Sequence, residues 1–271
     1  MSFIKENLIE INLGLKNEYK LIQISDVHAV DFNDSDSIDD INEAKKAEDI
    51  WYKQRTWFAD KANESYDESH LIPSKECLNN LINYINDENP DVSVLSGDII
   101  DYYSKSNYKL LVESIKKINT KYIFSPGNHE TPVDRYKEIF NNSTGFTVLD
   151  LDDFKIVSLD DSTKLVSADT LNSLKKELED DKLIIISMHI PISTIYNKEE
   201  LSKYDPYFLI YEDDTDEITK EFIDILANNP KIKAILSGHI HGHSESYFAP
   251  NKIECIASSG LIGFVNKIII R

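Results

Sequence analysis

Short apolar runs recur along the chain, and most of them are closed by residues that favour turns. Such a run predicts a buried β-strand, and several of the runs lead directly into charged or metal-binding side chains. Because ligands bind at the carboxyl ends of strands in open α/β sheets, these ends are candidate sites. The predicted strands cover residues 19–25, 91–96, 183–187 and 234–237, together with the run that begins at Tyr122 and is broken at Pro126.

Helical patterns of apolar residues lie between these strands. In the segment 74–88, Ser74 is a candidate N-cap and Pro90 ends the pattern. Strands that alternate with helices predict an α/β fold. The other helical patterns cover 106–118, 168–179 and 218–227. Hairpins are predicted for 8–13 with 19–25 and for 146–151 with 154–160, and short antiparallel strands for the tail 244–271.

The segment 29–73 is not needed by the predicted sheet. Its first part is acidic, and 41–58 spaces apolar residues at helical intervals. Both tryptophans of the protein, Trp51 and Trp57, lie here with Arg55 between them. The preferred interpretation is a surface helix that packs a small core of its own. The alternative is a lid that carries aromatic rings and a cation to a substrate.

Length and charge limit the partners that this chain can take. Its 271 residues suffice for one large core, so we expect a single domain over 1–271 with an insertion or lid at about 29–73. The 48 acidic and 29 basic residues give a formal net charge of −19. Such a charge makes nucleic acid and membrane surfaces improbable partners but allows small phosphorylated substrates, because bound divalent ions would reverse the local potential.

Cysteine usage and the chain ends predict a reducing, cytoplasmic setting. Cys77 and Cys255 show no paired spacing, so we expect two buried thiols without a disulfide or a metal site. The first residues lack the apolar stretch of a secretory signal, and no run reaches the length of a membrane span.

The predicted strand ends carry side chains of one chemical kind. The groups are carboxylates, an amide and imidazoles, and five of the seven histidines of the chain lie among them; His70 and His243 are the other two. One such motif arises easily by chance, but a set at five strand ends predicts a metal site. The residues are Asp26 with His28, Asp98, Asn128 with His129, His189, and His239 with His241.

In this order the motifs resemble the calcineurin-like metallophosphoesterase superfamily. The resemblance extends from about residue 21 to 242, with 29–73 as an insertion, and it implies a four-layer α/β/β/α sandwich with a dinuclear metal site at the strand ends. The matching blocks are Asp26-x-His28, Gly97-Asp98-x-x-Asp101, Gly127-Asn128-His129-Glu130, Met188-His189 and Gly238-His239-x-His241.

The resemblance also implies a role for each matching residue. His129 would face the leaving-group oxygen as general acid or charge stabiliser, and Asp101 would hold its imidazole. Asp98 would bridge two ions. One ion would be held by Asp26, His28 and His241, and the other by Asn128, His189 and His239.

The chemistry of these groups agrees with that implication. Mixed nitrogen and oxygen ligands suit Mn²⁺, Fe or Zn²⁺ better than Ca²⁺. Two such ions, roughly 4 Å apart, acidify a bridging water and stabilise both ends of an in-line displacement. We therefore expect hydrolysis of a phosphomonoester or phosphodiester by a metal-bridging hydroxide.

Departures from the superfamily patterns narrow this expectation. Tyr102 and Tyr103 stand where protein phosphatases carry Arg-Gly, which argues against a phosphoprotein substrate. Asp101 stands where purple acid phosphatases place a metal-binding tyrosine, which argues against a ferric-tyrosinate centre. Glu130 replaces an aspartate that is frequent in cyclic-nucleotide diesterases, and this subgroup stays possible.

Two other functions stay open. A binding or scaffold protein on the same fold is one, and the complete ligand set with His129 and Asp101 argues against it. A nuclease is the other, and the net charge of −19 argues against it.

Overall fold

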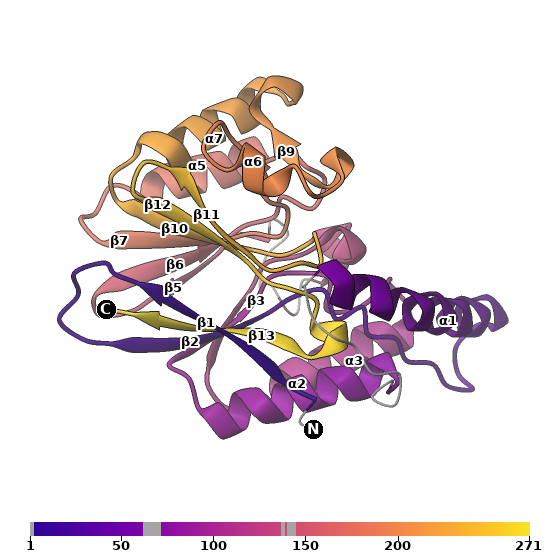
Figure 1. Ribbon diagram of the computed structural model, residues 1–271. Helices are drawn as coiled ribbons and strands as arrows, with labels where there is room; N and C mark the ends of the chain where they lie inside the picture. The colour runs from indigo at the N-terminus through magenta and orange to yellow at the C-terminus, as the bar shows by residue number, and fades with distance from the viewer. Residues whose placement is uncertain (1–2, 62–71, 137–138, 140–144) are drawn as a thin grey trace.

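Two β-sheets form the middle of the molecule (Figure 1). The computed structural model describes residues 3–61, 72–136, 139 and 145–271. Within these residues the first sheet has five strands in the order β1-β13-β2-β3-β4. They are β1 (Lys5–Ile11), β13 (Phe264–Ile270), β2 (Tyr19–Ile24), β3 (Val92–Leu95) and β4 (Lys121–Phe124).

The hairpin predicted for 8–13 with 19–25 is wrong. Both segments are strands, but β13 lies between them, parallel to β1 and antiparallel to β2. Strands lie about 4.8 Å apart, so the connection 12–18 is long enough to step over one strand. Because β13 lies between β1 and β2, it is in the interior of the sheet rather than at its edge, and its Ile268 and Ile270 are fully buried.

The second sheet has the order β11-β12-β10-β7-β6-β5. Its central strands β10, β7 and β6 are parallel, and β5 and β11 pair antiparallel at the two edges. The predicted hairpin at 146–151 with 154–160 is therefore confirmed. Of the antiparallel strands predicted for the tail 244–271, β11 and β12 pair with each other, but β13 joins the first sheet instead. The bounds are β11 (Ser244–Ala249), β12 (Lys252–Ile256), β10 (Ile232–Ser237), β7 (Leu183–Ser187), β6 (Phe154–Ser158) and β5 (Thr147–Asp150).

Helices cover the outer faces of both sheets (Figure 1). Helices α2 (Ser74–Glu88) and α3 (Lys105–Lys116) pack on the first sheet, and α5 (Ala168–Glu177) and α7 (Glu217–Asn228) on the second. A third apolar cluster, which includes Ile9, Val94, Ile156 and Leu236, fills the space between the sheets. Each sheet thus buries both faces, as its apolar strands require. The predicted four-layer α/β/β/α sandwich is confirmed.

Short elements complete the described chain. Residues 193–217 contain most of them and pack partly against the strand ends. They are β8 (Ile192–Ser193), β9 (Ile210–Tyr211), α6 (Lys198–Leu201) and the 3₁₀ turns Asn128–Glu130, Val133–Tyr136, Pro206–Phe208, Glu212–Asp214 and Gly260–Ile262.

Buried serines join the two sheets near their carboxyl ends. The hydroxyls of Ser125 and Ser187 are 2.6 Å apart, and Ser158 donates a hydrogen bond of 2.7 Å to the carbonyl oxygen of Phe124. These bonds link β4 to β6 and β7, so the loops that follow the strands of both sheets start from a fixed common position. That common position is where the candidate site lies.

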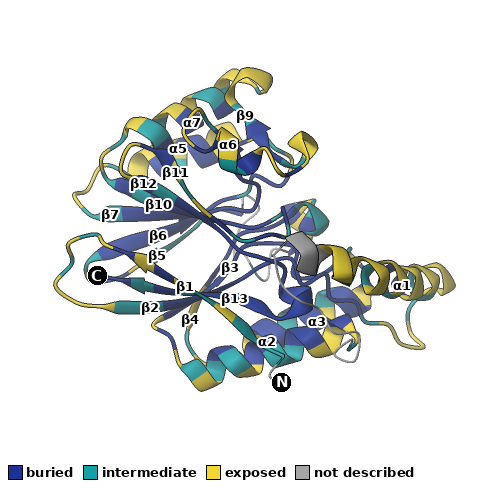
Figure 2. Cartoon of the chain, in the orientation of Figure 1, coloured by how far each residue is buried: buried dark blue, intermediate teal, exposed yellow. Residues whose placement is uncertain are grey.

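The insertion forms helix α1 (Ile38–Lys61), which projects from the side of the molecule (Figures 1 and 2). Val30, Ala44 and Ala47 form a small buried cluster beside it, as the surface-helix interpretation expected. Trp51 packs on that cluster but also reaches the strand ends. The preferred interpretation was therefore incomplete, and His70 lies outside the described residues.

The start of α2 differs from the prediction. Ser74 is the first helical residue and not the N-cap; its hydroxyl accepts a hydrogen bond from the Val30 N–H and donates one to the Glu48 carboxylate. The cap is Pro73, and the serine instead fastens α1 to α2.

Among the described residues, no helix combines the length and the apolar character that crossing a bilayer would need.

Candidate metal centre

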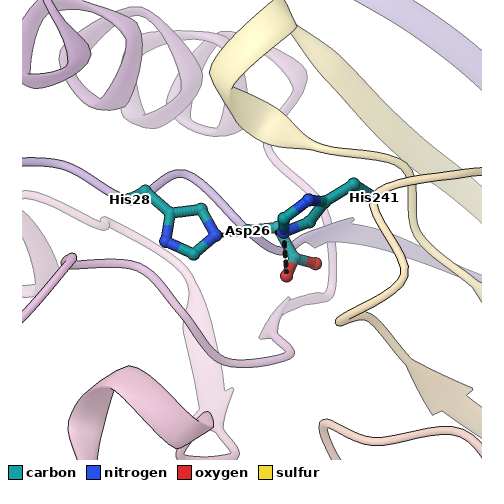
Figure 3. Close-up of side chains that lie close together, drawn as sticks. All are labelled: Asp26, His28 and His241. Atoms are coloured by element: carbon teal, nitrogen blue, oxygen red, sulfur yellow. Dashed lines mark hydrogen bonds and ion pairs between the residues drawn. The ribbon is translucent and has the colours of Figure 1, made fainter. Parts of the chain in front are cut away.

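The seven predicted ligands meet at the carboxyl ends of five strands, β2, β3 and β4 of the first sheet and β7 and β10 of the second. Six of them, all but Asn128, belong to overlapping groups within which all ligand atoms lie within 4.8 Å of one another. In Figure 3 the ring of His241 lies over the Asp26 carboxylate, to which a dashed line joins it, and the ring of His28 lies beside them. The groups are Asp26 with His28 and His241, His28 with Asp98 and His129, and Asp98 with His189 and His239.

Five of the seven predicted ligands have a left-handed backbone, with φ between 49° and 68°. Residues other than glycine seldom adopt this region, and each instance costs about 1–3 kcal/mol. Hydrogen bonds hold these turns: the His28 N–H donates to the Asp98 carbonyl oxygen, and the His239 N–H donates to the Asp26 carboxylate. The five residues are Asp26, His28, Asp98, His239 and His241.

Asp26 and His28 do not rely on an extended backbone to point the same way, since neither residue is extended. The left-handed turn and the adjoining strand of the second sheet bring the groups together instead. His28 Nε2 lies 3.0 Å from His241 Nε2, which lies 3.2 Å from Asp26 Oδ1.

His28 and His189 each use one ring nitrogen to fix the ring. His28 Nδ1 lies 3.2 Å from Asp101 Oδ1, and His189 Nδ1 donates a 2.6 Å hydrogen bond to the Ser96 carbonyl oxygen. Because a carbonyl or carboxylate oxygen only accepts, the Nδ1 atoms carry the protons and the Nε2 atoms face the site. That arrangement leaves both Nε2 atoms directed at the position of a cation.

The remaining donor atoms test whether a metal would fit. Asn128 Oδ1 and His239 Nε2 are buried and have no hydrogen-bond partner among the described residues. Burial and the neighbouring His189 lower the pKa of His239 to about 3, so its ring is neutral, as a metal ligand must be. Bound cations would satisfy both atoms, which otherwise carry a desolvation cost of about 1–3 kcal/mol each.

Asp98 belongs to two of the three groups. Its Oδ2 lies 3.0 Å from His189 Nε2, and its Oδ1 accepts a hydrogen bond of 2.9 Å from the His129 N–H. Burial alone would lower the pKa of His189, but the Asp98 carboxylate raises it to about 10. The site thus attracts positive charge, and two cations that share Asp98 fit its residues.

His129 lies beside this cluster and keeps part of its side chain exposed to solvent. Its Nδ1 donates to the backbone carbonyl oxygen of Asp101 and lies 3.3 Å from the Asp101 carboxylate, so the backbone holds the ring together with the carboxylate that we expected. Nε2 is 3.9 Å from Asp98 Oδ2 and faces the site. Burial alone would lower the pKa of His129, but Asp98 and Asp101 raise it to about 10.

Two buried carboxylates that sequence reasoning left without a role position the ligand loops. Glu130 accepts hydrogen bonds of 2.8–3.1 Å from four backbone N–H groups, those of Gly127 and of the loop 98–100. Asp161 accepts bonds of 2.8 Å from the N–H groups of His189 and Ile190. Burial raises the pKa of each carboxyl to about 7. The signal for Asp161 was its place just after the predicted strand 154–160.

A cavity of about 150 Å³ opens over the cluster. Five of the seven predicted ligands and His129 form its floor, and Trp51, Gln54 and Trp57 from one face of α1 form a wall. Phe208 lies opposite, with its ring centroid 5.3 Å from that of His239. Arg55 does not line this cavity: its side chain is buried on another face of α1 and donates to the Ile72 carbonyl oxygen, so the lid alternative is wrong in bringing this cation to the substrate.

Comparison with known proteins identifies the class. Residues 19–243 match the sequence model of the calcineurin-like phosphoesterase family, and the chain belongs to this family. The predicted family is therefore confirmed. This family implies two divalent metal ions, and the ligand groups of the site could hold them.

Individual relatives agree with this class. The chain is 28% identical over 162 residues to a probable cyclic nucleotide phosphodiesterase of Coxiella burnetii, covering 56% of this chain and 60% of the relative. It is 27% identical to a probable glycerophosphodiester phosphodiesterase of Arcobacter nitrofigilis, covering 66% of each. The matches thus span about two thirds or less of these relatives. A dimetal phosphatase from Danio rerio has the same fold, with a TM-score of 0.60 at 13% identity over 90% of this chain and 88% of that one.

Proposed function

We propose that the chain hydrolyses phosphoester bonds in small molecules, with phosphodiesters as the preferred class. The observation that carries this proposal is the set of overlapping ligand groups that share Asp98 beside His129. When bound, two divalent ions (Mn, Fe or Zn) would activate a water for attack on phosphorus and stabilise the transferring phosphoryl group. Asp26, His28 and His241 would hold the first ion and Asn128, His189 and His239 the second, with Asp98 shared.

His129 acts as the general acid in this proposal. With Nδ1–H donated to Asp101, the ring presents Nε2 toward the cavity, where a leaving-group oxygen would lie. His129 passes the Nε2 proton to that oxygen as the bond to phosphorus breaks, and Asp101 keeps the ring in this orientation. Asp101 is thus a positioning residue for His129.

The relatives and the cavity support a small diester as the substrate. The two relatives described above are named as phosphodiesterases of cyclic nucleotides and of glycerophosphodiesters. The cavity is small, about 150 Å³, which favours a small ester over a duplex. The net charge of −19 further opposes a polyanionic substrate, so the nuclease alternative is the weaker one.

We likewise propose that the chain is a single domain with the insertion at about 29–73. A cytoplasmic location stays a prediction.

The test is an activity screen on the metal-loaded protein. The chain is reconstituted with Mn²⁺ and assayed on p-nitrophenyl phosphate, on bis(p-nitrophenyl) phosphate and on a panel of cyclic nucleotides. We expect turnover of the diesters that EDTA abolishes and Mn²⁺ restores. A protein that holds two ions but turns over no ester would support the scaffold alternative. Salt-sensitive binding and cleavage of DNA would support the nuclease.

A further inference from the structure

Trp51 connects the inserted helix α1 to the candidate centre. Its indole Nε1–H donates a hydrogen bond of 2.7 Å to Asp101 Oδ1. Its ring also stacks on the His28 ring, with centroids 4.1 Å apart and planes 27° apart. One side chain from outside the family motifs therefore contacts both a predicted metal ligand and the carboxylate beside the proposed general acid.

Asp101 Oδ1 is the point where these contacts meet. Besides the Trp51 indole, His28 Nδ1 lies 3.2 Å and His129 Nδ1 3.3 Å from the same oxygen. The Asp101 side chain is largely buried, with 12% of its surface exposed, so these partners rather than water decide its orientation. A change in one of the three contacts shifts the carboxylate that the other two use.

The helix is fastened so that Trp51 stays at this place. The Tyr102 hydroxyl donates to the Asp40 carbonyl oxygen near the start of α1, at 2.9 Å. Further along, the Glu48 carboxylate accepts bonds from the N–H and the hydroxyl of Ser74, at 2.8 and 2.6 Å. These bonds tie α1 to α2 and to the loop after β3.

We propose that Trp51 is a positioning residue of the active site, which orients Asp101 through its indole N–H and thereby sets His28 for metal binding and His129 for proton transfer. The metal-binding part rests on the proposed dinuclear site, and the kinetic part rests on the proposed function. The inserted helix is then part of the active site and not only a cover for it.

A purely structural role for Trp51 makes a different prediction. A ring that only fills space against His28 needs no indole N–H, so Trp51→Phe would keep its function. Trp51→Phe keeps an aromatic ring on His28 and removes only the bond to Asp101, which makes it the decisive variant. Tyr52→Phe is the matched control, because Tyr52 is the next aromatic residue on α1, is half exposed and lines a different cavity.

The first measurement needs no turnover. The protein contains two tryptophans, so ¹⁵N labelling gives two indole N–H signals, assigned with Trp51→Phe and Trp57→Phe. We expect Zn²⁺ and the substitution Asp101→Asn each to shift the Trp51 signal more than the Trp57 signal. Trp51→Phe should weaken Zn²⁺ binding, measured by calorimetry, about tenfold, the lower end of the range for groups that orient metal ligands. Tyr52→Phe should bind as the wild type does.

The second measurement separates kcat from KM. On the Mn²⁺-loaded protein, Trp51→Phe should lower kcat about tenfold for an alkyl ester and leave KM nearly unchanged, because it removes the bond to Asp101 and keeps an aromatic ring in the wall of the cavity. Wild-type metal affinity together with wild-type kcat in Trp51→Phe would overturn the inference, as would a Trp51 signal that ignores both Zn²⁺ and Asp101→Asn. If the wild type turns over no ester while Trp51→Phe still binds Zn²⁺ less tightly, the proposed function fails and the positioning of His28 stands.

Discussion

The two proposed ion positions share Asp98 but are supported by different parts of the molecule. At the first position, the Asp101 carboxylate orients His28, and Trp51 from the insertion stacks on the His28 ring. At the second position, His189 is oriented by the Ser96 carbonyl oxygen, and its backbone is held by Asp161. The first position thus depends on a segment outside the sandwich, and the second on the loops of the two sheets alone.

This difference teaches which part of the site is adjustable. Groups that hold the second position are backbone atoms and a fully buried carboxylate between the sheets, where a change disturbs the core. The first position is supported by side chains of a helix that projects from the molecule (Figure 1). We expect substitutions on α1 to change the affinity for the first ion and the substrate preference. Substitutions around β6 and β7 should change the affinity for the second ion and the stability of the fold.

The largest effect should come from the residue that the two positions share. Asp98→Asn removes the charge that lies between two dications, so both ions should be lost together. With several kcal/mol of transition-state stabilisation gone, turnover should fall by at least about 10³-fold. Elemental analysis and activity on a diester measure both effects, and a full complement of metal in the variant would contradict the assignment.

Removal of the proposed acid should spare both ions. His129→Ala should keep the metal content of the wild type and lose about 10²–10⁴-fold in turnover, the usual scale for a positioned acid–base group. The loss should be smaller for nitrophenyl esters, whose leaving groups need little protonation. Equal losses for nitrophenyl and alkyl esters would leave His129 with an electrostatic role only.

Glu254, which is buried on β12 of the second sheet, should make the free energy of unfolding depend on pH. Burial raises its pKa to about 8, above that of an exposed glutamate. A carboxyl whose pKa is raised by folding destabilises the fold increasingly as the pH rises from about 4.5 to about 8, by on the order of a few kcal/mol. Urea unfolding at pH 5, 6.5 and 8 should show the wild type losing stability relative to Glu254→Gln. Parallel pH profiles of the two proteins would exclude this effect.

Asp161→Asn should weaken the second position and leave the first nearly intact. The Asp161 carboxylate accepts hydrogen bonds from the N–H groups of His189 and Ile190. An asparagine amide can accept only one of the two bonds, because its NH₂ group would face the other N–H group. We expect affinity for the second ion to fall about 10–100-fold, as it does when an orienting group is lost. Stepwise calorimetric titration with Mn²⁺ resolves the two ions, and equal weakening of both would show that the positions are not supported separately.

Replacement of residues 31–70 by a short Gly/Ser linker is the complementary change. It removes Trp51 and Glu48, so the first ion should bind about tenfold more weakly while the second binds as before. Activity on a small generic ester should persist, and discrimination among larger phosphoesters should be lost with the wall of the cavity. An unfolded product would show that the segment belongs to the core, and unchanged substrate preference would mean that α1 does not select substrates.

The sequence by itself determined the class and the candidate donor residues. Apolar runs ending in Asp26, Asp98 or His239 are local signals, because a strand that is buried on both faces must be apolar and the loop after it is free to carry polar groups. The order of these motifs along the chain was enough to predict the four layers. Element bounds followed the same local patterns, as in β7, which covers the predicted 183–187.

Only the tertiary structure decided how distant segments meet. The place of β13 between β1 and β2, the burial of Arg55 and the contact of Trp51 with Asp101 depend on packing between residues far apart in the chain. An amphipathic pattern shows that α1 has an apolar face, but not which element that face meets. For the same reason the roles of Glu130 and Asp161, which hold backbone N–H groups of other loops, were not visible in the sequence.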